Sequence, residues 1–251
     1  MVNEPIFDVA GVHFSYEDEA PALTDVWLQV QPGECLAILG ANGSGKSTLL
    51  KLLDGLYFAT QGTVRAFGQE LTERAFRNQA FTFGFRRRVG LVFQDPDVQL
   101  FSPSVLDEVA FAPLQLGLSP SEVEQRVEWA LQALRIEGLR ERAPHRLSGG
   151  EKKRVALASV LSLQPEVWLL DEPTNGLDPR SRGWLVEFIQ QQHQEGKTMV
   201  IATHDISLVQ SVATRVCVFG EDHRVAAQGA PADLLQDHNL LHACNLIHIH
   251  P

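Results

Sequence analysis

The stretch CLAILGANGSGKSTLL, residues 35–50, decides the fold of this chain. Its first five residues are all apolar, which is typical of a strand that is buried on both faces. The following GANGSGKST, residues 40–48, fits the pattern G-x-x-x-x-G-K-[ST]. The run TLLKLL then predicts a short helix that ends at Asp54-Gly55. A glycine-rich turn between a buried strand and a helix indicates an α/β fold built around a phosphate-binding loop.

The residues of this loop suit a nucleotide triphosphate. Glycines let the backbone wrap closely, so that successive N–H groups point at phosphate oxygens, and the helix adds its positive N-terminal end. Lys46 is expected to reach the β- and γ-phosphates, and the Ser47 hydroxyl to ligate Mg²⁺. A chance glycine-rich turn is the alternative, which the flanking strand and helix disfavour. The predicted nucleotide contacts of the loop are Asn42, Gly43, Ser44, Gly45, Lys46, Ser47 and Thr48.

Polar groups also follow two later apolar strands. VWLLDEPT, residues 167–174, ends in Asp171, suited to hold Mg²⁺ through water, and Glu172, suited to polarise the attacking water as a general base. TMVIATHD, residues 198–205, delivers His204, which we expect to contact the γ-phosphate. Ligands of open α/β sheets bind where strands end, so these groups are predicted to meet the loop. The alternatives are exposed turn acids and a structural histidine.

The remaining pattern predicts one domain, residues 1–251, with an inserted segment. Strands alternate with helices in residues 1–94 and 163–251, which favours a largely parallel sheet closed by an antiparallel hairpin of CVF and RVAAQ. Residues 95–162 are expected to be mostly helical, with a clear helix start at Ser119-Pro120-Ser121-Glu122. A further helix is predicted over residues 180–194.

Composition excludes several classes of protein. The chain has 251 residues, 44% hydrophobic and 21% charged, which is ordinary for a globular protein. Its net charge of −10 disfavours nucleic-acid binding. Cys35, Cys217 and Cys244 form no CxxC pair, so we expect buried reduced thiols rather than disulfides or a zinc site. We see no signal peptide and no apolar run of roughly 20 residues, so any membrane contact is expected through a partner.

The motifs occur in an order that resembles a known family. The loop is followed by VFQDP with Gln94, LSGGE from Leu147, LLDEPT, GLDP from Gly176 and ATHD. Together they resemble the ATP-binding subunit of an ABC transporter over almost the whole chain. The resemblance implies a P-loop NTPase (RecA-like) core with a mostly parallel sheet, an antiparallel β subdomain and an inserted α-helical subdomain that carries LSGGE.

The resemblance also assigns roles to further residues. It implies a head-to-tail dimer in which Ser148, Gly149 and Gly150 of one subunit bind the γ-phosphate of ATP held by the other. The helix starting near Glu151 would point its positive end at this phosphate. Family members more often have glutamine at Glu151, a change that we expect to leave activity intact. The other implied roles are adenine stacking for Tyr16 (otherwise an ordinary strand tyrosine), sensing of Mg²⁺ and of the attacking water for Gln94, and a place at the dimer seam for Asp178.

The segment QDPDVQLFSPSVLDEVAFAP, residues 94–113, resembles the energy-coupling-factor branch, especially the cobalt and nickel uptake ATPases. There it borders a groove for a membrane partner. The residues expected to attract and contact its basic helices are Asp95, Asp97, Asp107 and Glu108 by charge, and Val98, Leu100 and Phe101 by apolar contact. The alternative is a solvated acidic turn with core residues.

These observations favour an ATP-hydrolysing importer subunit for cobalt or nickel, with ATP and Mg²⁺ as cofactors. ATP binding is expected to close a homodimer and hydrolysis to reopen it. The expected partners are a transmembrane scaffold subunit and a substrate-binding membrane subunit, and the expected location is the cytoplasmic face of the inner membrane. A vitamin importer, a soluble non-transport ABC ATPase and a nucleotide-binding regulator without turnover are the alternatives.

Two further clusters attract attention. A metal site is conceivable among His238, His242, Cys244, His248 and His250, but we favour spare histidines on a soluble helix. Arg86-Arg87-Arg88 is interpreted as a solvated face, with lipid-headgroup contact as the alternative.

Overall fold

A computed structural model describes residues 4–17 and 20–248 of the chain. Its main sheet has six strands in the order β10-β9-β3-β8-β7-β6, and every neighbouring pair except β9 and β10 runs parallel. The largely parallel sheet and its closing hairpin are therefore confirmed. The strands are β3 (Cys35–Gly40), β6 (Val89–Val92), β7 (Val167–Asp171), β8 (Thr198–Thr203), β9 (Arg215–Phe219) and β10 (Val225–Gly229).

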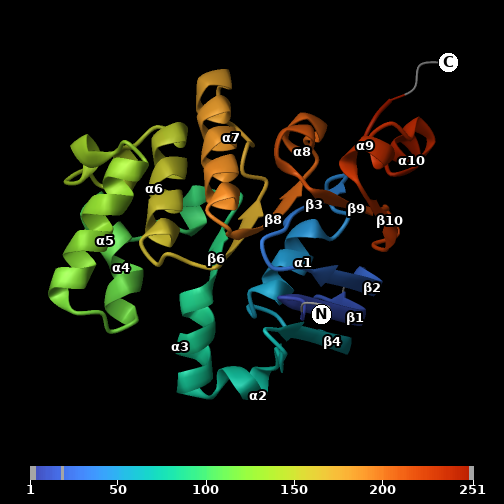
Figure 1. Ribbon diagram of the computed structural model, residues 1–251, viewed down its shortest axis with the longest axis horizontal. Helices are drawn as coiled ribbons and strands as arrows, with labels where there is room; N and C mark the ends of the chain where they lie inside the picture. The colour runs from blue at the N-terminus through green and yellow to red at the C-terminus, as the bar shows by residue number, and fades with distance from the viewer. Residues whose placement is uncertain (1–3, 18–19, 249–251) are drawn as a thin grey trace.

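A smaller antiparallel sheet packs beside the main one, at the right of Figure 1. Its order is β2-β1-β4-β5, and its strands are β1 (Phe7–Ser15), β2 (Pro21–Val30), β4 (Gln61–Ala66) and β5 (Gln69–Glu70). Helix α1 (Lys46–Leu53) contributes leucines to the apolar core that both sheets share. Its end is set by Gly55, whose φ of +67° is readily adopted only by glycine.

The faces of the main sheet are covered by different helices. In β7, Trp168 and Leu170 pack with α7 (Pro179–Gln194), whereas Val167 and Leu169 point to the side of α1. This alternation follows from the two-residue period of a strand. Helix α8 (Ile206–Val212) and the C-terminal helices α9 (Pro231–Leu234) and α10 (His238–Ala243) complete the β3–β9 side.

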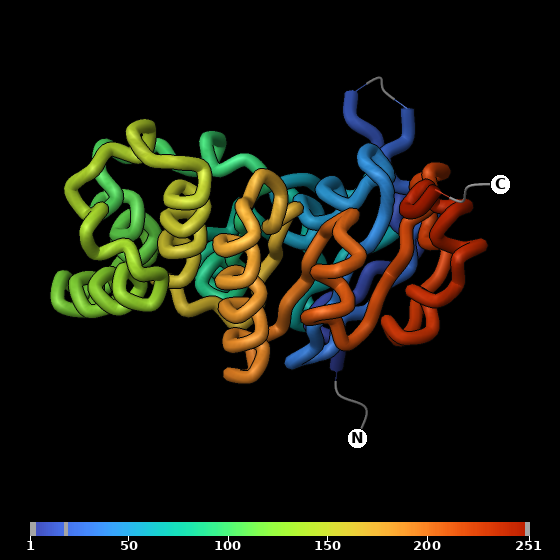
Figure 2. Tube along the Cα trace, turned by 90° about the horizontal axis from the view of Figure 1, so that it is seen from above, coloured from blue at the N-terminus to red at the C-terminus, as the bar shows by residue number. Residues whose placement is uncertain are grey.

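The predicted helical segment lies at the left of Figure 1, and Figure 2 shows the same grouping from above. Its helices are α4 (Val105–Gln115), α5 (Pro120–Ala133) and α6 (Gly149–Leu161), with short 3₁₀ turns at η1 (Pro96–Val98), η2 (Glu137–Leu139) and η3 (Pro144–Arg146). Helix α5 starts with a complete capping box between Ser119 and Glu122, as the sequence predicted.

Arg86-Arg87-Arg88 is partly solvated, since Arg87 is exposed and its two neighbours are half-buried, but each arginine also has a protein partner. They form the last turn of α3 (Gln79–Arg88), which follows the short α2 (Glu73–Phe76). Arg86 bonds the Asp54 carboxylate at 2.6 Å, and Arg87 donates to the Leu116 carbonyl at 2.8 Å. Arg88 is held bidentately by Glu166 at 2.9 and 2.8 Å. Together they fasten α3 to three other segments.

All three cysteines lie in the described part of the chain, whereas the histidine-rich tail is described only up to His248. Cys35, Cys217 and Cys244 are free and buried, and burial raises the pKa of the Cys35 and Cys217 thiols to about 12. Within residues 4–17 and 20–248, no group of three or more His, Cys, Asp or Glu side chains is placed to hold a metal ion. His250 lies outside the described residues. The described part of the chain also has no helix that is both long and apolar enough to span a membrane.

Candidate functional site

A cleft of about 610 Å³ opens where β3, β7 and β8 end. Ten of the predicted site residues line it, so the sheet brings together groups that are far apart in sequence. They are Tyr16, Asn42, Gly43, Gly45, Lys46, Ser47, Thr48, Gln94, Glu172 and His204. The same cleft is lined by residues that the sequence did not single out, namely Ala20, Pro21, Ala22, Asn175 and His223.

The glycine-rich loop has room for a ligand on one side and none on the other. At Gly45 the φ is +105°, and a Cβ there would lie 2.3 Å from the Ala22 carbonyl oxygen, so only glycine fits. At Gly43 a Cβ would meet nothing within 4 Å. Among the described residues, the buried Ser44 hydroxyl has no hydrogen-bond partner, and no side chain caps the start of α1. Unused donors at a helix N-terminus are suited to phosphate.

Lys46 is fixed at the floor of the cleft. The residue is 5% exposed, and its Nζ donates to the carbonyls of Gly40 and Ala41, both at 2.9 Å. The same Nζ lies 3.4 Å from Oε1 of Glu172. A buried ammonium held in this way presents a fixed positive charge to an anionic ligand.

Ser47 and Asp171 form a pair of oxygen ligands next to Lys46. The Ser47 hydroxyl donates to the Asp171 carboxylate at 2.8 Å, and burial raises the pKa of Asp171 above its ordinary value. A hydroxyl and a carboxylate oxygen at this distance suit a hard divalent cation.

Glu172 is buried in a strained backbone conformation. Its φ is +41°, and its Oε2 accepts from the Thr203 hydroxyl at 3.2 Å and the His204 amide at 3.4 Å. Nδ1 of His204 lies 3.0 Å from Oε1, but without the direction of a hydrogen bond, so Oε1 has no hydrogen-bond partner among the described residues. An oriented carboxylate whose Oε1 lies beside the Lys46 ammonium but accepts no hydrogen bond from the described residues can accept a proton from water.

Tyr16 follows β1 and is anchored at the other end of the cleft. Its hydroxyl lies 3.0 Å from that of Thr48, and its ring makes edge contacts with Phe14 and Tyr57. The aromatic ring therefore has a fixed place beside the loop.

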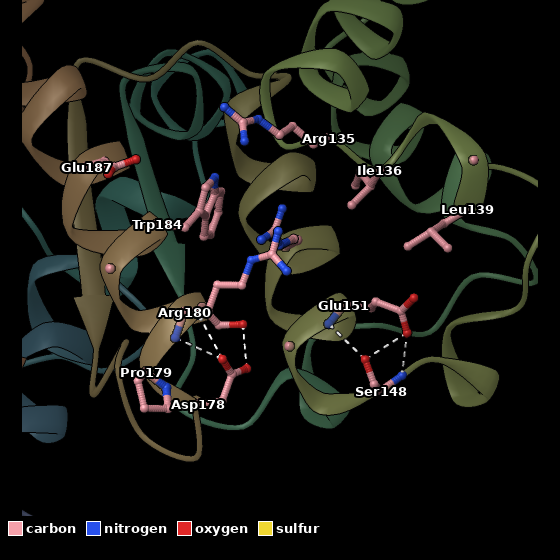
Figure 3. A pocket seen from close by; sticks show the side chains of 15 residues that line it. Arg135, Ile136, Leu139, Ser148, Glu151, Asp178, Pro179, Arg180, Trp184 and Glu187 are labelled. Carbon is pink, nitrogen blue, oxygen red and sulfur yellow. Dashed lines mark hydrogen bonds between the residues drawn. The ribbon is translucent and has the colours of Figure 1, made fainter.

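The LSGGE residues lie in a different cleft. Figure 3 shows Ser148 and Asp178 on opposite sides of this space of about 970 Å³, which is also lined by Gly150. The sequence predicted that this helix starts near Glu151. In the structure α6 begins two residues earlier, at Gly149. The reason is a capping box: Ser148 and Glu151 bond each other's backbone N–H groups, and these bonds hold the pKa of Glu151 below its usual range.

Asp178 has a related capping role. Its Oδ1 accepts from the backbone amides of Arg180 and Ser181 at 2.9 and 3.1 Å, which starts α7. The bonds to Ser181 hold the pKa of Asp178 below its ordinary value. The chain therefore does not bring Ser148, Gly149, Gly150 or Asp178 to its own glycine-rich loop cleft.

Of the four acidic groups in residues 95–108, only Glu108 is buried, whereas Asp95, Asp97 and Asp107 are exposed. Glu108 is buried and accepts from the amides of Phe101 and Ser102 at 2.9 and 2.7 Å. Asp97 pairs with Lys152 at 2.6 Å, and Asp107 accepts from the Ser104 hydroxyl. Asp95 caps η1.

Two of the three apolar side chains of this segment are exposed. Val98 and Phe101 are 70% and 67% exposed, while Leu100 packs against the core. Phe101 also borders an apolar groove of about 370 Å³, together with the exposed Phe83 and Phe111.

Two side chains missed by sequence reasoning hold the Gln94 segment. Lys153 is 2% exposed and donates to the carbonyls of Phe93 and Gln94 at 3.2 and 3.0 Å; burial lowers its pKa to about 8. Gln99 accepts from the Phe93 amide at 3.1 Å and donates to the Ala156 carbonyl of α6 at 3.0 Å. Nothing in the sequence distinguishes Lys153 from its neighbour Lys152.

Comparison with known proteins decides the family. The model of the ABC transporter family matches residues 23–175. The chain belongs to the ABC transporter family. It is an ATP-binding, ATP-hydrolysing subunit, and its fold is that of the ABC ATPases.

Curated relatives of this ABC ATPase share its full length. The nickel import ATP-binding protein NikO of Rhodobacter capsulatus is 48% identical over 97% of this chain and 96% of its own length. The energy-coupling factor transporter ATP-binding protein EcfA of Methanothermobacter thermautotrophicus is 40% identical over 96% of this chain and 76% of its own.

Solved structures agree with these relatives. The CbiO1 protein of Clostridium perfringens, part of the ABC transporter complex CbiONQ, has a TM-score of 0.81 and 36% identity, covering 97% of this chain and 96% of its own. The ATP-binding cassette MJ0796, solved as a dimer in a post-hydrolysis state with ADP and phosphate, has a TM-score of 0.79 and 27% identity, covering 90% and 98%.

Proposed function

We propose that this ABC ATPase drives the import of cobalt or nickel ions across a membrane. The observation that carries the hydrolytic part is the buried arrangement of Lys46, Glu172 and the Ser47–Asp171 pair around one cleft. The choice of cargo is supported by the similarity to NikO and to CbiO1 over nearly the whole chain.

The residues that the sequence singled out have the following parts in this proposal. The loop amides and Lys46 hold the triphosphate, and Tyr16 stacks on the adenine. Ser47, Gln94 and Asp171 would hold Mg²⁺, which supplies neutralisation of phosphate charge when bound. Glu172 orients the attacking water and takes its proton, and His204 contacts the γ-phosphate.

The second subunit completes the site. Ser148, Gly149 and Gly150 lie away from the chain's own loop, at the exposed start of α6. We propose that two copies pack head to tail, so that this end of α6 meets the γ-phosphate held by the other copy, with Asp178 at the seam. ATP binding then favours the closed dimer, and hydrolysis removes that preference.

Membrane contact is proposed to occur through partner subunits. The groove bordered by Phe83, Phe101 and Phe111 is apolar and opens beside the Gln94 segment, so it suits a helix of a transmembrane scaffold subunit. A second membrane subunit would select the cargo. We propose that the protein lies peripherally on the cytoplasmic face of the inner membrane. We also propose that residues 95–162 form the subdomain that carries both Phe101 of this groove and LSGGE.

The decisive experiment is uptake of labelled cobalt and nickel by cells that carry the parent protein or Glu172→Gln. The proposal expects the variant to abolish uptake of at least one metal at equal protein levels. Unchanged metal uptake with reduced uptake of a vitamin would keep the ATPase function and overturn the choice of cargo.

A further inference from the structure

We propose that His223 is a further nucleotide-binding residue, whose Nε2–H donates a hydrogen bond to an oxygen of the bound nucleotide. His223 lies in the turn between β9 and β10 and lines the same cleft as Tyr16 and Lys46. None of the roles assigned above involves it. The inference rests on the proposed function insofar as this cleft must hold ATP.

The backbone at His223 does not need an imidazole. Its φ is +63°, in the left-handed region that disfavours residues with a Cβ. The turn is nevertheless fixed, because the His223 amide donates to the Gly220 carbonyl at 3.2 Å and its carbonyl accepts from the Thr24 amide at 3.0 Å. A glycine would make the same backbone bonds without the steric cost, so these bonds do not explain the side chain.

The two ring nitrogens of His223 differ in their surroundings. Nδ1 is buried and has no partner among the described residues, although the residue as a whole is only half-buried. Because His223 lines the cleft while its Nδ1 is buried, we infer that the ring presents its Nε2 edge to the cleft. A neutral imidazole has one N–H and one lone pair, and a buried unpaired acceptor is better tolerated than a buried unpaired N–H. The proton thus belongs on Nε2, where it is available to a ligand.

Within the described residues, the adjoining wall of the cleft offers no other side-chain donor. It consists of Ala20, Pro21 and Ala22, whose side chains cannot form hydrogen bonds. The Thr24 amide bonds the His223 carbonyl, which holds His223 beside the strand that carries Pro21 and Ala22. The imidazole is therefore a side-chain donor placed at this wall. Sugar hydroxyls and phosphate oxygens of a nucleotide are the matching acceptors.

The test is equilibrium binding of ATP to the purified full chain by calorimetry in EDTA, where no hydrolysis takes place. We expect His223→Gly to raise the Kd for ATP about 3- to 10-fold, the loss of one hydrogen bond. The melting temperature without nucleotide should not fall, because glycine accepts this φ. Gln164→Gly is the matched control, since Gln164 has a φ of +56° and does not line the cleft. Its Kd should equal that of the parent.

The outcomes separate this inference from the proposed function. If the parent binds ATP, Lys46→Ala does not, and His223→Gly binds as the parent does, the role of His223 is overturned while the function stands. A lower melting temperature together with weaker binding in His223→Gly would also overturn it, because that pattern marks a structural role. If Lys46→Ala binds ATP as well as the parent, the assignment of the cleft itself fails.

Deoxynucleotides locate the acceptor. If the difference between the parent and His223→Gly disappears with 2′-deoxy-ATP or 3′-deoxy-ATP, the acceptor is that sugar hydroxyl. If the difference persists with both, the acceptor is neither hydroxyl but a phosphate oxygen or the ring oxygen of the sugar.

Discussion

Nζ of Lys46 lies 3.4 Å from Oε1 of Glu172, and both side chains are only 5% exposed. Each charge is thus compensated by the other inside the cleft. Removing one partner leaves an uncompensated buried charge, which costs more than removing both. We expect Lys46→Met to lower the free energy of unfolding by about 3 kcal/mol without nucleotide, and Glu172→Gln to restore about 2 kcal/mol of it in the double variant. A complete set of urea denaturation curves measures this coupling, and strictly additive effects would contradict it.

Glu172→Gln should separate binding from hydrolysis. The amide keeps the shape of the side chain but cannot take a proton, so we expect the ATPase rate to fall by about 10²- to 10⁴-fold. ATP affinity should stay within a few-fold of the parent, and the variant should accumulate as an ATP-bound dimer. Steady-state phosphate release and size-exclusion chromatography with ATP check both parts. Glu166→Gln offers a control, because Glu166 is a surface acid outside the cleft. A Glu172→Gln protein that hydrolyses ATP at the parental rate would remove Glu172 from its proposed role.

The pH dependence of stability should report on Asp54. Burial raises the pKa of this carboxyl from 3.8 to about 6 in spite of the adjacent Arg86. Between these values the folded state keeps a proton that the unfolded state loses, so the contribution of Asp54 to stability falls as pH rises from about 4 to 6. Asp54→Asn has no such proton. Relative to the parent, it should therefore gain up to about 3 kcal/mol between pH 4 and pH 7. Urea denaturation of both proteins at pH 4 and pH 7 measures this gain. The same difference in free energy of unfolding at both pH values would argue against a raised pKa of Asp54.

The groove beside the Gln94 segment should matter for transport but not for basal hydrolysis. Phe101 is 67% exposed and touches no group of the nucleotide cleft. We expect Phe101→Asp to abolish metal uptake and co-purification of the membrane partner. Basal ATPase activity of the isolated subunit should stay within about twofold of the parent, because the substitution is at the surface. Trp129→Asp is the matched control, an exposed aromatic residue outside the groove. Equal loss of uptake in both variants would show that the groove has no special role.

Glu151 should tolerate exchange for glutamine. The capping box needs an oxygen at this position that accepts from the Ser148 amide, and a glutamine side chain supplies one. We expect Glu151→Gln to keep the ATPase rate within about threefold and Glu151→Ala to lower the melting temperature as the cap is lost. The lowered pKa of Glu151 means that its share of stability is present above its ordinary pKa and is lost as the pH falls below it. A large loss of ATPase activity in Glu151→Gln at an unchanged melting temperature would indicate a direct role in the site.

The sequence was most informative where function depends on contiguous residues. The glycine-rich loop, the acids after β7 and the capping box of α5 are local patterns, and the main sheet then brings the loop and Glu172 to one edge. Pairings across long separations had no such signal. Arg86, Arg87 and Arg88 looked like a solvated run, although their partners lie 32, 29 and 78 residues away. The same holds for His223, whose place in the cleft depends on a backbone contact with β2.

The bonds from Lys153 and Gln99 to the Gln94 segment link the chain's own nucleotide cleft to the start of α6. Gln94 borders the chain's own cleft, whereas the start of α6 carries Ser148 and Gly149. Because Lys153 and Gln99 bond α6 to this segment, we expect the two to move together. In the proposed dimer, a turn of α6 would then withdraw Gln94 from the ATP of its own subunit and the LSGGE loop from the ATP of the other subunit in a single motion. In the proposed dimer, one helix displacement therefore loosens both nucleotide sites together.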